Sequence, residues 1–209
     1  YHLRVVQVFT NIMTKLLVSS IKALIFLFRS TIIVLGWVAM RGMSITSGPV
    51  TKMEDFIPVF HVISAALCLH YIFLYQQSFA SFDVLKREVR KYKQQKVELE
   101  ASKKGDYDKP VKPTLASIKY SPLDNVEILK ADRCVGNFIE QVIPFFIALC
   151  GYSMYVSVIG AVKYGWAWII FRSYYGLVFN SNRIFLSTLP AYFCVWTMIG
   201  RTLYETMQY

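Results

Sequence analysis

The sequence predicts an all-α, polytopic membrane protein: a four-helix transmembrane bundle preceded by an N-terminal amphipathic or membrane helix. Two observations predict this fold class. Of the 209 residues, 55% are hydrophobic and only 17% are charged, whereas soluble domains carry about 25% charged residues. The apolar residues also gather into runs close to the ~20 residues that a helix needs to cross a bilayer. A soluble globular protein is thereby excluded.

The chain is strongly basic, with a formal net charge of +10. In a soluble protein this charge would suggest nucleic acid. Here the cations lie in loops and at the ends of apolar runs, where they orient helices and meet anionic lipid. We therefore expect the lipid bilayer as a partner and no nucleic acid. Because the chain begins at Tyr1 rather than Met, we also expect further N-terminal sequence, such as a targeting segment.

We divide the chain into an N-terminal extension, residues 1–52, and a membrane domain, residues 53–209. The extension holds a largely apolar run over residues 8–40, interrupted by Lys15, Lys22 and Arg29. Their seven-residue spacing places the three cations on one helical face. The favoured interpretation is an amphipathic helix lying in the membrane interface. The alternative is a spanning helix whose basic stripe faces a partner or water.

In the membrane domain, spans are predicted at residues 56–77, 126–158, 165–179 and 184–203. The last three are joined by short links, IGAVKYG and NSNR, so antiparallel neighbours are expected. Interfacial aromatic residues are predicted at Trp166, Trp168, Tyr174 and Tyr175.

Residues 78–130 form a polar, basic region with 12 Lys/Arg against 8 Asp/Glu. The first part, residues 85–100, is predicted to be a helix that extends the preceding span out of the membrane, and KKGDYDKPVKPT to be irregular. The excess of cations places this region on the cytosolic or equivalent side.

Histidine and cysteine do not form a convincing metal site. His61 and His70 are nine residues apart, which does not put them on one helical face, so we expect buried, hydrogen-bonded histidines and no metal. The four cysteines, which we expect to be small buried hydrophobes, form no CxxC pair and so indicate neither a structural zinc site nor a disulfide framework: Cys68, Cys134, Cys150 and Cys194.

Polar residues interrupt the third apolar run. Arg133, Asn137 and Glu140 are spaced i, i+4 and i+7, so they share one face of a helix that soon becomes wholly apolar. Inside a membrane such groups must pair or meet water, and they are functional candidates. The alternative is an interhelical polar cluster that sets helix register.

The next run contains FRSYYGLVF. Arg172 and Tyr175 share a face, which Phe179 continues, and Arg183 follows at the next boundary. The structural alternative is a snorkelling arginine among interfacial aromatics. No hydrolase, zinc-protease or nucleotide-binding motif occurs in a credible context.

These residues resemble the MAPEG superfamily, the membrane-associated proteins in eicosanoid and glutathione metabolism. The pattern Arg-x-x-x-Asn-x-x-Glu of the family's second helix is present as Arg133, Asn137 and Glu140. Its third-helix pattern, Arg-x-x-Tyr-x-x-x-Tyr, is matched by Arg172 and Tyr175 and fails at residue 179, which is Phe. The resemblance covers roughly residues 56–203.

The resemblance implies a four-helix bundle that assembles as a homotrimer and binds glutathione between subunits. By that analogy Arg133 would help to activate the thiol, with Tyr175 beside the thiolate. The remaining candidates would bind the polar parts of the tripeptide: Asn137, Glu140, Arg172 and Arg183. A guanidinium favours thiolate over thiol, so the chemistry is reasonable. The N-terminal extension and the long polar region depart from the compact family form, and each offers a surface for attachment.

Two functions therefore compete. The favoured one is an accessory or structural subunit of a larger membrane complex, without a cofactor. The alternative is a glutathione-dependent transferase or peroxidase acting on lipophilic substrates, with self-assembly as a homotrimer. A transporter or channel is less favoured, because no inverted repeat or broken-helix pair is visible. The expected location is an organelle membrane, mitochondrial or endoplasmic reticulum.

Overall fold

The structure is a computed structural model that describes residues 19–20, 27, 30–31, 48–101, 110–120, 126–179 and 183–208. Most of the run at residues 8–40, with Lys15, Lys22 and Arg29, lies outside the described residues. The choice between an interfacial and a spanning helix there stays a prediction.

The described part of the chain is helical. A short 3-10 helix, η1 (Met53–Phe56), leads into α2 (Ile57–Ala101), and α3 (Leu115–Tyr120) lies within the polar region of residues 78–130. Three further helices complete the chain: α4 (Val126–Tyr155), α5 (Val158–Val178) and α6 (Ile184–Thr206). The predicted all-α, polytopic membrane fold is thus confirmed.

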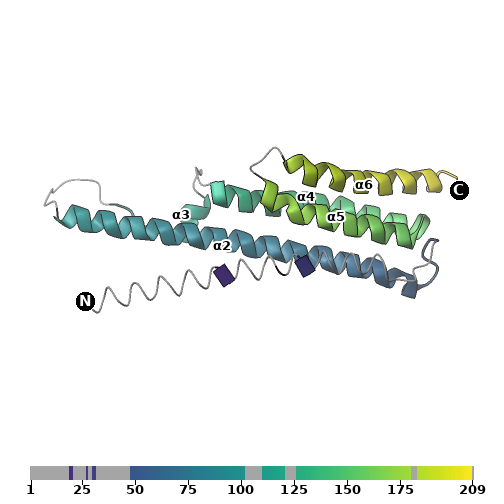
Figure 1. Ribbon diagram of the computed structural model, residues 1–209, viewed down its shortest axis with the longest axis horizontal. Coiled ribbons are helices and arrows are strands. Elements are labelled where there is room, and N and C mark those ends of the chain that lie inside the picture. Colours follow the sequence, from purple (N-terminus) through teal and green to yellow (C-terminus); the bar gives the residue numbers. More distant parts are fainter. Residues whose placement is uncertain are drawn as a thin grey trace.

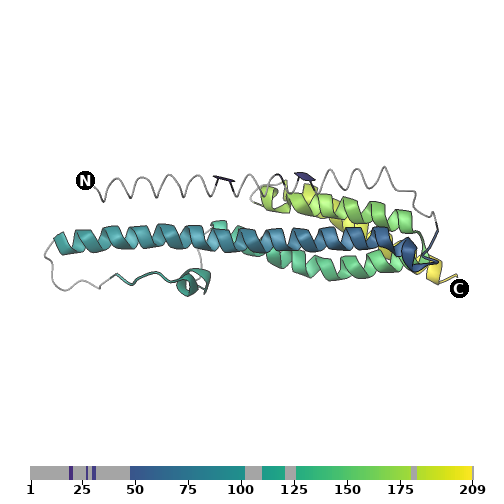
Figure 2. The ribbon, with the colours of Figure 1, turned by 90° about the horizontal axis from the view of Figure 1, so that it is seen from below.

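The long helices α2, α4, α5 and α6 form an antiparallel bundle. Figures 1 and 2 show α2 running the length of the molecule, with the other three packed beside one half of it. Helices α4 and α5 each pack against all three of the others. By length and composition, α2 with η1, α4 and α6 are each long and apolar enough to cross a membrane. Helix α5, at 21 residues, is about 31 Å long but carries Lys163 and Arg172.

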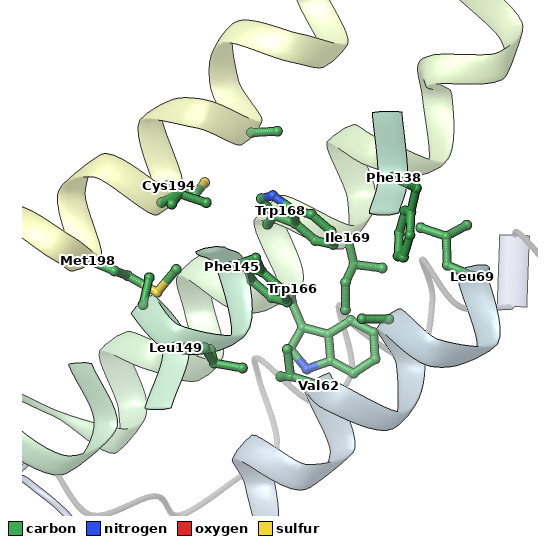
Figure 3. Packing of buried hydrophobic residues seen from close by; sticks show 14 of the residues in the cluster. Val62, Leu69, Phe138, Phe145, Leu149, Trp166, Trp168, Ile169, Cys194 and Met198 are labelled. Atoms are coloured by element: carbon green, nitrogen blue, oxygen red, sulfur yellow. The ribbon is translucent and has the colours of Figure 1, made fainter. Parts of the chain in front are cut away.

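The interior of the bundle is packed around one residue of α5 (Figure 3). Trp168 has no exposed surface and stacks on Phe145 of α4, with ring centroids 3.9 Å apart and an interplanar angle of 6°. On the face of α6 that points away from this interior, large apolar side chains are exposed, as expected of a surface that faces lipid: Phe185, Leu186, Leu189, Phe193 and Trp196.

The predicted link IGAVKYG between the third and fourth spans was wrong. Helix α5 already begins at Val158, and the connection is made by residues 156–157, where the Ser157 side chain accepts a hydrogen bond from the Gly160 N–H at 3.2 Å. The two glycines mark close helix packing rather than a loop. A Cβ on Gly160 would lie 2.6 Å from Tyr152, and one on Gly165 would lie 2.6 Å from Val62.

Several predicted side-chain environments were also wrong. Trp166, Trp168 and Tyr175 are buried in the bundle instead of lying at its outer boundary, because they lie on the faces of α5 that pack against the other helices; Tyr174 is exposed. His61 is exposed, since it lies on the outer face of α2. His70 is half-buried and stacks on Phe138, and its Nδ1 atom is buried without a hydrogen-bond partner among the described residues.

The cysteine prediction was partly right. All four thiols are free, and Cys134 and Cys194 are buried, but Cys68 is exposed and Cys150 is half-buried. Cys68 was wrongly placed inside because the apolar run of α2 has an outer face that meets lipid as well as an inner one.

The loop before α2 closes one end of the bundle. The Val50 N–H donates to the Ser153 carbonyl, and the Val158 N–H donates to the Gly48 carbonyl, each at 3.0 Å. The Thr51 hydroxyl and the backbone N–H groups of Thr51 and Lys52 donate to Asp55. These hydrogen bonds hold the pKa of Asp55 below its usual value, so they favour the ionised carboxylate at the helix start.

At the other end, α2 leaves the bundle. The predicted helical extension over residues 85–100 is confirmed, because α2 continues unbroken to Ala101. Helix α3, which the sequence reasoning did not predict, packs on this part through a small cluster of Val84, Ile118 and Ile128. The projecting helix carries Lys, Arg and Glu around its surface, which is the composition of a solvated helix.

Candidate functional site

The centre of the candidate site is a buried arginine. Arg172 of α5 is 1% exposed, and its Nη1 atom donates to Oδ1 of Asn137 on α4 at 2.6 Å. The guanidinium carbon lies 5.4 to 6.0 Å from the ring centroids of Tyr192, Trp168 and Tyr175. The structural alternative, in which Arg172 snorkels to the membrane boundary, is therefore wrong. Arg172 joins α4, α5 and α6 inside the bundle.

The guanidinium is incompletely satisfied. Its Nε and Nη2 atoms are buried and have no hydrogen-bond partner within the described ranges, and the same holds for Nε1 of Trp168, one turn earlier on α5. Beside them, Nε2 of Gln141 donates to the Tyr192 hydroxyl at 3.4 Å. These donors form a polar layer across three helices in an apolar interior, where each unmet donor is costly.

Arg133 and Glu140 lie elsewhere, on the outer surface of α4. Both side chains are exposed, while Asn137 between them is half-buried. Neither makes a hydrogen bond or ion pair with any described residue. The three residues lie on one side of α4, as predicted, but α5 covers only part of that side. Asn137 lies in the covered part, and Arg133 and Glu140 lie outside it.

The remaining candidates fall into two places. Tyr175 is buried beside Arg172, and its ring meets that of Phe179 edge-on with centroids 6.0 Å apart. Arg183 is exposed at the start of α6. One chain therefore brings Asn137, Arg172 and Tyr175 together. Arg133, Glu140 and Arg183 are exposed, and of these three the charge of Arg133 lies near enough to Tyr175 to act on it.

Sequence reasoning missed Gln141 and Tyr192. Gln141 directly follows Glu140, so its side chain points to the next part of the helix circumference, toward α6. A polar residue there within an apolar run was the available signal. Tyr192 had no such signal, because a tyrosine among apolar residues is ordinary in a membrane helix. No group of three His, Cys, Asp or Glu residues able to hold a metal occurs in the parts of the chain that the structure describes.

The Arg172–Asn137 contact predicts an ordered series of stabilities. Asn137→Ala leaves a buried guanidinium without its partner and should lower the free energy of unfolding by about 1.5–3 kcal/mol. Arg172→Met removes the charge and keeps most of the volume, so it should cost less. Melting temperatures in detergent, followed by circular dichroism, measure the order. If Arg172→Met proved the more damaging of the two, the guanidinium would be contributing more than its contact with Asn137.

The antiparallel bundle, with apolar outer walls and a polar layer shared by α4, α5 and α6, is that of a helical integral membrane protein. The MAPEG family model matches residues 65–204, which is more than half of the chain and covers α4 and α5 completely and most of α2 and α6. The chain belongs to the MAPEG family. Neither a curated protein nor a solved structure matches it.

Proposed function

We propose that this protein is a structural subunit of a larger membrane complex, joined to other membrane-protein chains through the outer face of α4. The single observation that carries the proposal is Glu140. It lies near the middle of α4, in a helix long and apolar enough to cross a membrane, and it is exposed and unpaired among the described residues. A carboxylate facing lipid at that depth costs about 2.5–3.5 kcal/mol on insertion scales. A neighbouring chain that supplies a cation or hydrogen-bond donor removes this cost.

The surroundings of Glu140 suit a protein contact. Arg133 lies two turns earlier, also exposed and unpaired, and Ile143 and Ile147 follow on the same face with exposed side chains. Exposing these unpaired charges to lipid is energetically unfavourable, whereas a partner chain with complementary charges and apolar side chains could bind this surface. The extension over residues 1–52 is a further candidate for attachment to other chains.

The glutathione enzyme is the second candidate, and one observation favours it. Arg133 and Glu140 are open to a ligand, as a site between subunits of a homotrimer requires. Two observations weigh against it. Arg172 is 1% exposed and already bonded to Asn137, so a carboxylate cannot reach it without displacing neighbouring side chains. Phe179 offers no hydroxyl. Within one chain the described candidate residues do not converge on a single pocket that could hold glutathione.

The test is purification of the tagged full-length chain in mild detergent from its native membrane. We expect other integral membrane chains at fixed stoichiometry, with one copy of this chain in each complex. Glu140→Lys should release those chains, whereas Glu98→Lys, the same charge reversal on the exposed projecting part of α2, should not.

The opposite result is equally definite. A free homotrimer whose melting temperature rises with millimolar glutathione would overturn the structural-subunit proposal and favour the transferase or peroxidase, because a ligand that binds only the folded state stabilises it.

A further inference from the structure

A cavity of about 230 Å³ opens at the end of the bundle from which α2 projects. Figure 1 shows the beginning of α4 and the end of α5 meeting there beside α2. The cavity is lined by Gln76 of α2, by Gly176 and Leu177 of α5, and by the first turns of α4, including Lys130 and Cys134. It lies apart from the outward-facing Glu140, which is not among its lining residues.

Along the membrane normal, the cavity lies at the level of the lipid headgroups. Gln76 lies where the apolar part of α2 gives way to its charged extension, Lys130 is about one turn into α4, and Leu177 is next to the last residue of α5. The basic region at residues 78–130 lies on this side of the bundle. The cavity is therefore at the cytosolic or equivalent leaflet, where the positive-inside rule places that region.

The charges at the cavity leave one ammonium group available. Glu127, which also lines it, is paired with Arg87 through two hydrogen bonds between α2 and α4. Asp132 nearby accepts a hydrogen bond from Gln77 at 2.8 Å. Lys130 is half-buried and makes no hydrogen bond or ion pair with any residue that the structure describes. The two local carboxylates are thus occupied, and an unpaired cation remains.

Part of the cavity wall is apolar. Ala131 and Cys134 are buried in its wall, while Leu177 is 59% exposed and continues onto the outer surface of the bundle. A ligand that places an anion at Lys130 can therefore extend an apolar chain over Leu177 into the bilayer. Basic pockets between transmembrane helices on the cytosolic or matrix side bind anionic lipid headgroups in this way.

We propose that the cavity between α2, α4 and α5 binds the phosphate of an anionic phospholipid, with Lys130 as the cation that holds it. The inference goes beyond the proposed function, because it requires neither a particular partner chain nor glutathione.

The experiment is a lipid titration of the purified full-length protein in a nonionic detergent. Phosphatidylglycerol and phosphatidylcholine with the same acyl chains are added separately, and the melting temperature is followed against the lipid mole fraction. We expect phosphatidylglycerol to raise the melting temperature in a saturable way and phosphatidylcholine to have little effect.

Two variants locate the site. Lys130→Gln should weaken the apparent affinity for phosphatidylglycerol roughly fivefold. Lys93→Gln, the same change on the exposed projecting part of α2, should leave it unaltered. A third arm adds inorganic phosphate alone at millimolar concentration, which should not shift the melting temperature.

Three results would overturn the proposal: equal stabilisation by the two lipids, an equal loss in the two variants, or a full shift from inorganic phosphate, which would indicate a site for a free anion. Should Lys130→Gln fold poorly, the phosphatidylglycerol retained by the native protein through detergent exchange, measured by mass spectrometry against phosphatidylcholine, decides the question without a variant.

Discussion

Replacing Trp168 by alanine should remove about 3–5 kcal/mol from the free energy of unfolding. The indole has no exposed surface, stacks on Phe145, and lies 5.7 Å from the guanidinium carbon of Arg172. Truncation leaves a cavity at the point where α4, α5 and α6 meet, and the rigid helices around it can collapse only in part. The loss is read from unfolding in mixed detergent and dodecyl sulfate micelles, followed by circular dichroism.

The chain contains its own control. Trp196 of α6 is 71% exposed on the outer wall, so Trp196→Ala makes the same chemical change without opening an interior cavity. Its effect should stay within about 0.5 kcal/mol, as for other surface substitutions. Similar losses in the two variants would mean that Trp196 is covered in the micelle or that Trp168 is not at the centre of the packing.

Adding a single methyl group at Gly165 should have the second-largest effect. The Cβ of an alanine there would lie 2.6 Å from a methyl of Val62 on α2 and 3.0 Å from a methyl of Leu149 on α4. Helix α5 would have to move away from both neighbours, and such overpacking costs about 1–3 kcal/mol. The intrinsic helix preference of alanine over glycine offsets up to about 1 kcal/mol of this.

Gly200 provides the matched comparison, since a Cβ there meets nothing within 4 Å. Gly200→Ala should raise the melting temperature slightly, because it gains helix preference without a clash. The two substitutions are thus expected to have opposite signs. Adding Val62→Ala to Gly165→Ala should restore part of the loss. If Gly165→Ala were neutral, the contact between α2 and α5 would be looser than the structure shows.

The polar candidates show what spacing can and cannot predict. The i, i+4, i+7 pattern correctly put Arg133, Asn137 and Glu140 on one side of α4. It could not say that Asn137 would turn inward to Arg172 while the two charged residues stayed outside. That division depends on where α5 crosses α4, which is a property of the assembled bundle. The partner of Glu140 stays a prediction.

The glycines of IGAVKYG were misread for a related reason. In a sequence, closely spaced glycines between two apolar runs favour a turn. In the bundle, Gly160 and Gly165 let α5 approach Tyr152 on α4 and Val62 on α2, and the turn needs only residues 156–157. Whether a glycine breaks a helix or brings it close to a neighbour is decided by packing across helices, which no local pattern contains.

By itself, the sequence determined the class of this protein, its helical content and the continuation of α2 out of the membrane, because these depend on the length and polarity of single segments. The motif formed by Arg133, Asn137 and Glu140 also resembles that of the MAPEG family, and the match of the family model to residues 65–204 confirms the resemblance. Only the tertiary structure decided which faces of α5 are buried, that Arg172 is enclosed, and that Glu140 faces outward. These outcomes follow from which faces the helices bury against one another, and burial is a relation between segments that are distant in the chain.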